Sequence, residues 1–87
     1  MNNFGLDFVQ CLELLREEGL KTIHTASTPE QIEQARITYL GRKGKLAQQL
    51  ASLPSLPQEE RPQAGQKANR IKQELTQALQ EAKSRLE

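Results

Sequence analysis

Residues 39–46 read Tyr39-Leu40-Gly41-Arg42-Lys43-Gly44-Lys45-Leu46, and two glycines enclose an Arg-Lys pair. Tyr39 and Leu46 are seven residues apart, a spacing that returns a helix to the same face. The same spacing extends outward to Ile32 and to Leu53. Because this phase runs through both glycines without a slip, it favours one continuous helix from about residue 29 to residue 53.

A loop at residues 41–44 is the alternative. Two glycines inside a helix cost roughly 2 kcal/mol together, and both would suit a loop. We favour continuity, since a loop gives no reason for the seven-residue phase to persist on its far side.

Both ends of this helix carry recognisable signals. Thr28 can cap the helix, Pro29 suits its first position, and Gln31 completes a capping box. Pro54 and Pro57 end the helix and turn the chain.

A further helix is predicted over about 58–87, because apolar residues recur there at alternating spacings of three and four. A connection of four residues makes two long helices antiparallel. If Leu53 lies opposite Gln58, Ile32 faces Leu79 and Tyr39 faces Leu75.

Upstream, a helix is predicted over about 6–25, with an apolar stripe at Phe8, Leu12, Leu15 and Ile23. A slender two-helix arm need not cover this stripe. Because exposed apolar faces tend to find partners, we expect weak self-association of the chain at high concentration.

The predicted fold class is therefore all-α: an antiparallel helical hairpin, a coiled-coil arm over residues 29–87, with an additional N-terminal helix in residues 1–28. Together these form one domain, which we expect to be a fragment of a longer chain. The 87 residues include no Trp, and no apolar run is long enough to span a membrane. The start of the chain shows no secretory signal, and Cys11 is the single cysteine, so a cytoplasmic location is expected.

The sequence predicts no catalytic residues and no metal site. His24 is the only histidine and has no cluster of possible ligands near it in sequence, so a structural or exposed role is the better interpretation. Neither a phosphate-binding loop nor a nucleophile motif is present. The chain alone is therefore not expected to be an enzyme.

Positive charge is concentrated in the middle of the chain. Residues 34–58 contain four bases and no acid, whereas residues 1–33 contain six acids and two bases. The hairpin register places Arg42 and Lys43 beside bases of the last helix. The candidate RNA-contacting residues are Arg42, Lys43, Lys45, Arg61, Lys67 and Arg70.

From charge alone, a solvated basic face is the simpler interpretation of this cluster. However, residues 39–46, the Leu56-Pro57 pair, Glu59-Glu60-Arg61 and the spaced Gly65, Asn69 and Lys72 together resemble the N-terminal domain of the bacterial-type phenylalanyl-tRNA synthetase alpha subunit. The resemblance covers about residues 29–87, while residues 1–28 match only in helical character. Arg42 and Lys43 carry over from the family motif, and the other bases are inferred from the register.

This resemblance implies a coiled-coil arm that grips tRNA outside its acceptor end. The parent would be a class II phenylalanine-tRNA ligase of two alpha and two beta subunits that uses ATP and magnesium in a catalytic module absent from these residues. The fragment itself would need no cofactor. With no interleaved aromatic residues, contact is expected with RNA shape and backbone. The alternative is a helical protein-interaction or self-association module without RNA binding.

Overall fold

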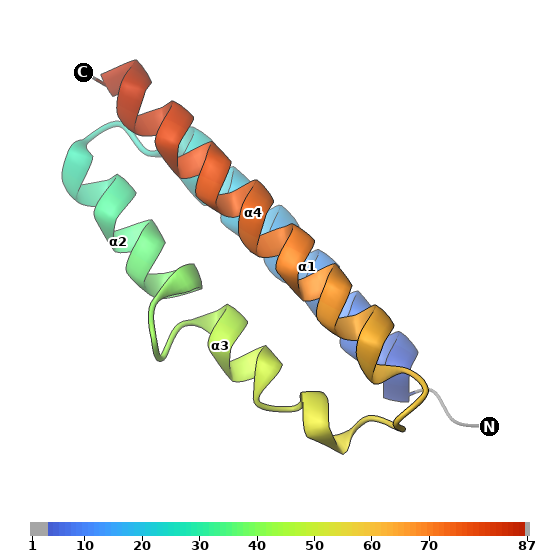
Figure 1. Cartoon of the computed structure of the whole chain (residues 1–87). Coiled ribbons are helices and arrows are strands. Elements are labelled where there is room, and N and C mark those ends of the chain that lie inside the picture. The colour runs from blue at the N-terminus through green and yellow to red at the C-terminus, as the bar shows by residue number, and fades with distance from the viewer. Residues whose placement is uncertain (1–3, 87) are drawn as a thin grey trace.

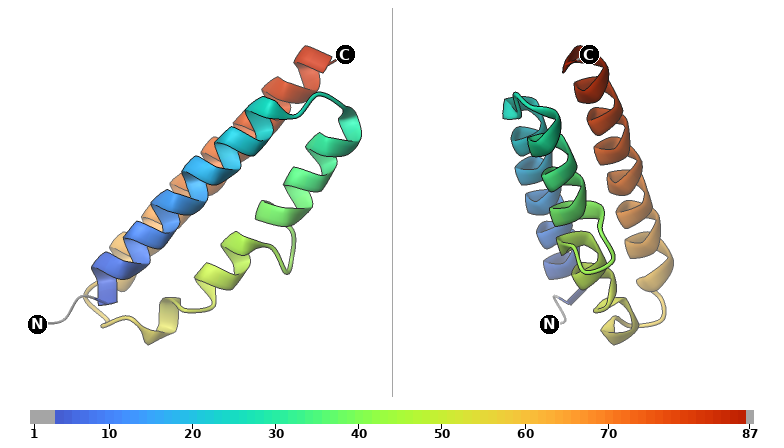
Figure 2. Two further views of the ribbon diagram at one scale, coloured as in Figure 1. Left: turned by 180° about the vertical axis from the view of Figure 1, so that it is seen from behind. Right: turned by 90° about the vertical axis from the view of Figure 1, so that its left-hand side faces the viewer.

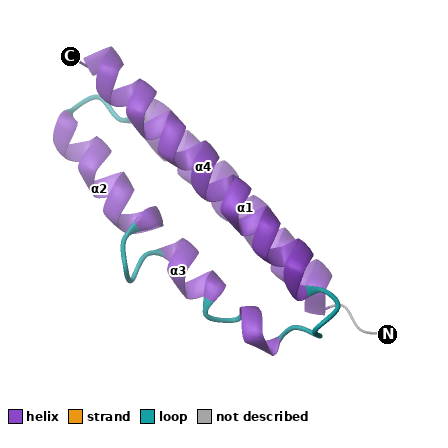
Figure 3. Ribbon diagram, viewed as in Figure 1, coloured by secondary structure: helices purple, strands orange, loops and turns teal. Residues whose placement is uncertain are grey.

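Four α-helices and one short 3₁₀ helix make up the computed structural model, which describes residues 4–86 (Figure 3). Their bounds are α1 Phe4–Thr25, α2 Pro29–Leu40, α3 Lys45–Leu50, the 3₁₀ turn η1 Leu53–Ser55 and α4 Arg61–Leu86. No strand occurs among these residues, so the predicted all-α class is confirmed. The N-terminal helix begins two residues before the predicted position 6.

The start of α2 follows the sequence signals closely. The Thr28 hydroxyl accepts a hydrogen bond from the backbone N–H of Gln31 at 3.2 Å, and Pro29 occupies the first turn. The Gln31 side chain accepts from the backbone N–H of Ser27 at 2.7 Å, one residue before the position a capping box would use.

The prediction of one helix over 29–53 is wrong, because α2 ends at Leu40 and α3 begins only at Lys45 (Figure 1). Yet Tyr39 and Leu46 both lie in the core, at 4% and 3% exposure. The seven-residue spacing of buried apolar residues therefore continues across the turn, because α2 and α3 both pack their apolar residues against the same neighbouring helices. Leu50, the last residue of α3, is 37% exposed.

The last helix also begins later than the predicted residue 58. Residues 58–60 form a turn, in which the N–H of Glu60 donates to the carbonyl of Pro57 at 2.9 Å. Pro62 lies in the first turn of α4, where a missing N–H is tolerated. The connection between α3 and α4 therefore spans residues 51–60 instead of four residues.

The helices form an elongated three-sided bundle with extents of 48 × 18 × 17 Å (Figures 1 and 2). Helices α1 and α4 run side by side in the same direction, and α2 followed by α3 runs back along both (Figure 2). Ile32 and Leu79 line one groove between α2 and α4, as the antiparallel register predicts.

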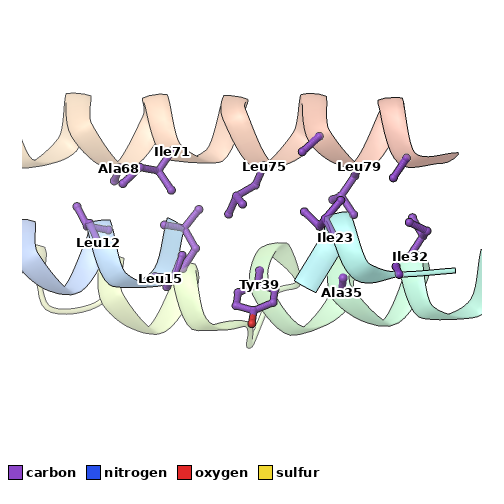
Figure 4. Close-up of a cluster of buried hydrophobic side chains, with 14 of the residues drawn as sticks. Leu12, Leu15, Ile23, Ile32, Ala35, Tyr39, Ala68, Ile71, Leu75 and Leu79 are labelled. Carbon is purple, nitrogen blue, oxygen red and sulfur yellow. The ribbon is translucent and has the colours of Figure 1, made fainter. Parts of the chain in front are cut away.

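The core is a row of hydrophobic side chains, mostly aliphatic, at the junction of the three sides (Figure 4). Leu12 and Ile23 from α1 and Ile71 and Leu75 from α4 are at most 1% exposed. The other buried residues are Phe8, Leu15, Ala26, Ile32, Ala35, Tyr39, Leu46, Leu56, Ala64, Ala68, Ala78, Leu79 and Ala82.

Helix α1 is an integral side of the bundle and not an appendage to a hairpin. Its predicted stripe is buried, with Phe8 at 4% and Leu15 at 7% exposure. The expectation of weak self-association assumed that this stripe is exposed. That assumption is wrong, because α4 and α2 cover the apolar face of α1. Of the large apolar side chains, only Leu14, Ile37 and Leu50 are exposed among those described, and isolated exposed residues of this kind are ordinary.

Over residues 4–86, none of the helices combines the length and the apolar character that crossing a membrane requires.

Candidate nucleic-acid interface

Gly41, Arg42, Lys43 and Gly44 form a tight turn between α2 and α3, here called the basic turn. The N–H of Gly41 donates to the carbonyl of Ile37 at 3.1 Å and ends α2. The N–H of Gly44 donates to the carbonyl of Gly41 at 2.9 Å, which closes a four-residue turn. Arg42 and Lys43 are therefore its two central residues, where side chains point away from the closed backbone.

Glycine is needed at both positions because the backbone of α2 lies too close to admit a side chain. An unusual dihedral angle is not the reason. Both have extended backbone angles that any residue adopts, with φ of −67° at Gly41 and −72° at Gly44. A Cβ atom at Gly41 would lie 2.5 Å from the Ile37 carbonyl oxygen, and one at Gly44 would lie 2.9 Å from the Thr38 carbonyl oxygen. The turn folds back onto the last carbonyls of α2, and a side chain would push it away.

We expect Gly44→Ala to destabilise the fold by about 1–3 kcal/mol, because a backbone atom must move to admit the methyl group. Gly65→Ala is the matched control, since a Cβ there meets nothing within 4 Å and alanine favours the helix. That variant should be more stable by about 0.5–1 kcal/mol. Urea unfolding of both variants measures the difference, and equal stabilities would contradict this role for Gly44.

The basic turn presents two exposed cations, Arg42 and Lys43. Neither forms a salt bridge with any of the side chains that the structure describes, those of residues 8–86. Their charges therefore face solvent and are available to an anionic partner.

Lys45, the third base of the motif, is instead bound to α1. Its ammonium donates to the Glu18 carboxylate at 2.7 Å and lies 5.4 Å from the centre of the Tyr39 ring. The hydrogen bond from Lys45 lowers the pKa of Glu18, and the same bond raises the pKa of Lys45. Lys45 thus joins the end of the basic turn to α1.

Arg61 and Lys67 also have partners inside the protein. The Arg61 guanidinium donates to the carbonyls of Leu56 at 3.0 Å and Pro54 at 2.9 Å, so it holds the connection before α4 in place. The Lys67 ammonium pairs with Glu13 of α1 at 2.9 Å. Lys67 therefore faces α1.

The remaining bases of α4 divide between two flanks. Arg70 is exposed and shares a shallow surface with Lys67, on the flank next to α1. Lys72 lines the groove between α2 and α4 together with Leu40, the residue immediately before the basic turn. Lys72 was missing from the candidate set, although it was part of the family motif. Lys72 lies three residues before Leu75, which the register places opposite Tyr39, so this spacing could have indicated the flank facing α2.

The described residues offer no metal centre. No three His, Cys, Asp or Glu side chains approach one another within the part of the chain that the structure describes. His24 is exposed at the end of α1, and Cys11 is an exposed free cysteine.

The chain is similar to one protein family along most of its length. Residues 27–87 match the family model described as aminoacyl tRNA synthetase class II, N-terminal domain. No solved structure matches the chain.

Curated relatives are alpha subunits of phenylalanine–tRNA ligase. The subunit of Nitratidesulfovibrio vulgaris is 44% identical over 82 residues, which are 94% of this chain and 24% of that protein. Those of Moorella thermoacetica and Thermosynechococcus vestitus are 40% and 42% identical over 78 residues, 90% of this chain and 23% of each protein. The similarity therefore extends into residues 1–28, which lie before the sequence motifs described above. The chain spans about a quarter of the length of these relatives.

Proposed function

The chain belongs to the family of class II aminoacyl-tRNA synthetase N-terminal domains, and on this premise we propose that it is the tRNA-binding arm of a phenylalanine–tRNA ligase alpha subunit. The observation that supports this most strongly is the basic turn. It holds Arg42 and Lys43 at the surface of an elongated bundle, without carboxylate partners among the described residues. Exposed, unpaired cations of this kind contact RNA phosphates at little cost, because no internal ion pair has to break.

We propose that Arg42 and Lys43 are the principal phosphate contacts. Lys72, next to Leu40 in the groove, and the exposed Arg70 on the opposite flank of α4 would extend the contact along the bundle. None of these residues is aromatic, so the arm would recognise RNA shape and backbone instead of base sequence.

Lys45, Arg61 and Lys67 stay candidate contacts of lower priority. Each already has an oxygen partner at 3.0 Å or less within the protein. To bind a phosphate, each would have to give up that partner, so its net contribution to RNA affinity would be smaller than that of Arg42 or Lys43.

The proposal extends to the parent enzyme. It would join phenylalanine to its cognate tRNA in the cytoplasm, as a heterotetramer with beta subunits. ATP and magnesium would act in a catalytic module outside this chain, which spans only about a quarter of the length of its relatives. The arm would then orient tRNA so that the acceptor end reaches that module.

The salt dependence of tRNA binding by the 87-residue chain tests this proposal. Each phosphate contact contributes a slope of about −0.7 to −0.9 to a plot of log affinity against log salt concentration. With three to five contacts, we expect a total slope between about −2 and −4.5, measured by fluorescence anisotropy with labelled tRNA. No detectable binding at low salt, or an affinity that salt does not change, would contradict the proposal and favour a protein-interaction role.

A further inference from the structure

Both ends of the basic turn are fastened to the same part of α1. Tyr39 lies two residues before the turn, and its hydroxyl is 3.2 Å from the hydroxyl of Thr22. Lys45 immediately follows the turn and donates to Glu18 at 2.7 Å. Glu18 and Thr22 are four residues apart on α1 and therefore lie on one face of that helix.

The two side chains that hold the ends of the turn, Tyr39 and Lys45, also lie close to each other. The Lys45 ammonium lies 5.4 Å from the centre of the Tyr39 ring. Tyr39 has its ring in the core and its hydroxyl directed away from α4 (Figure 4). Gly19 of α1 packs beside this ring, since a Cβ there would be in ordinary contact with the Tyr39 ring at 3.6 Å, while it would lie only 2.8 Å from the end of the Leu75 side chain. Glu18, Thr22, Tyr39 and Lys45 thus form one cluster, here called the clasp.

We propose that Glu18 is a positioning residue for the RNA-contacting turn, and that it acts through Lys45. The inference rests on the proposed function of Arg42 and Lys43. In this inference, Lys45 anchors the turn to α1 and does not contact a phosphate, although it belongs to the same basic motif. An anchored turn presents its two cations already ordered, so binding loses less conformational entropy than it would with a loose turn.

The sign of one substitution separates this proposal from simple electrostatics. If Lys45 were a phosphate contact, removing Glu18 would free it, and the more positive protein would bind RNA more tightly. If Glu18 positions the turn, its removal weakens RNA binding even though a negative charge has been lost. The two interpretations therefore predict opposite changes in affinity.

The test compares Glu18→Gln with Glu17→Gln in the 87-residue chain. The two changes remove the same charge at neighbouring exposed positions, but Glu17 forms no salt bridge with the described residues. Exposed ion pairs are worth about a two- to fivefold change in an equilibrium. We expect Glu18→Gln to weaken tRNA binding by about that factor, whereas Glu17→Gln leaves it unchanged or slightly tighter.

A charge swap provides the rescue. The double variant Glu18→Lys with Lys45→Glu restores an ion pair at the same place and keeps the net charge, so we expect affinity within about twofold of the original. Glu18→Gln binding as tightly as Glu17→Gln, or more tightly, would overturn the proposal. So would a charge swap that binds no better than Glu18→Gln.

A second measurement needs no RNA and separates failure of this inference from failure of the proposed function. Nuclear spin relaxation of the backbone amides of Arg42 and Lys43 reports the order of the turn on the fast timescale. We expect greater mobility in Glu18→Gln than in Glu17→Gln. Equal mobility would overturn the clasp even if the chain binds tRNA, while a mobile turn in a chain that never binds tRNA would refute the proposed function and, with it, the positioning role.

Discussion

Replacing Arg42 and Lys43 together with Glu in the full synthetase is expected to lower kcat/KM for tRNA charging by about ten- to a hundredfold. Each change removes an attraction to an RNA phosphate and adds a repulsion, for a combined cost of roughly 1.4–2.8 kcal/mol. Activation of phenylalanine with ATP should be unaffected, because in the proposed enzyme it needs no tRNA. If the arm only binds, the loss appears in KM for tRNA, and if it also orients the acceptor end, kcat falls too.

The control for this reversal is Lys83→Glu with Arg85→Glu. Both residues lie in the last turn of α4, where Arg85 donates to the carbonyl of Ala26 before the start of α2. They are therefore at the opposite end of α2 from the basic turn, roughly 18 Å away along that helix. We expect less than a threefold loss of charging in the control. Equal losses in the two double variants would contradict a specific role for the turn, and a parallel loss of activation would indicate a damaged fold.

Truncation of Leu75 to Ala is expected to have the largest effect on stability. Leu75 is fully buried at the point where α4 meets Gly19 of α1, and its side chain is within reach of the Tyr39 ring. Removing buried methyl groups costs the transfer free energy plus the cavity left behind, about 2–5 kcal/mol for Leu→Ala. For a domain of this size, that lowers Tm by roughly 10–30 °C.

Leu14→Ala is the matched control, since Leu14 lies on α1 but is 65% exposed. Its effect on the free energy of unfolding should stay within about 0.5 kcal/mol. Thermal unfolding followed by circular dichroism measures both variants. Similar Tm values for the two would show that the three-sided core described here does not carry the stability of the chain.

The helices could be predicted because local signals for them are strong. Thr28 and Pro29 mark the start of α2, and the recurring apolar residues of α4 mark its course. The break in the helix at the basic turn could not be predicted from the seven-residue spacing. Tyr39 and Leu46 keep that spacing on either side of the turn because both are buried in the same core. Periodicity reports which face is buried and does not report whether the backbone between two buried residues is helical.

The packing of α1 was harder to infer. Its apolar stripe is evident in sequence, but an isolated stripe fits either a bundle or an exposed docking face. In the structure Gly19 lies in this packed face, since a Cβ there would lie 2.8 Å from the end of the Leu75 side chain, and the stripe on either side of it is buried. From the sequence alone, the same glycine indicates only a position of low helix propensity.

The candidate site was predictable in its charges but not in its pairings. The basic character of residues 41–45 is evident from the sequence, and Arg42 and Lys43 are indeed exposed. That Lys45 is bound to Glu18, 27 positions away, and Lys67 to Glu13, 54 positions away, depends on how α1 packs. Bases with equal charge therefore differ in availability for a reason that only the tertiary structure reveals.

The most direct test of the proposed RNA contact is the change in salt dependence when the turn is neutralised. The slope of log affinity against log salt concentration is measured for tRNA binding by the unchanged chain and by Arg42→Gln with Lys43→Gln. Lys83→Gln with Arg85→Gln serves as the charge-matched control. Loss of two phosphate contacts should make the slope shallower by about 1.4–1.8, with little change in the control. An unchanged slope in the Arg42 and Lys43 variant would mean that these cations are a solvated surface and that the basic turn does not contact RNA.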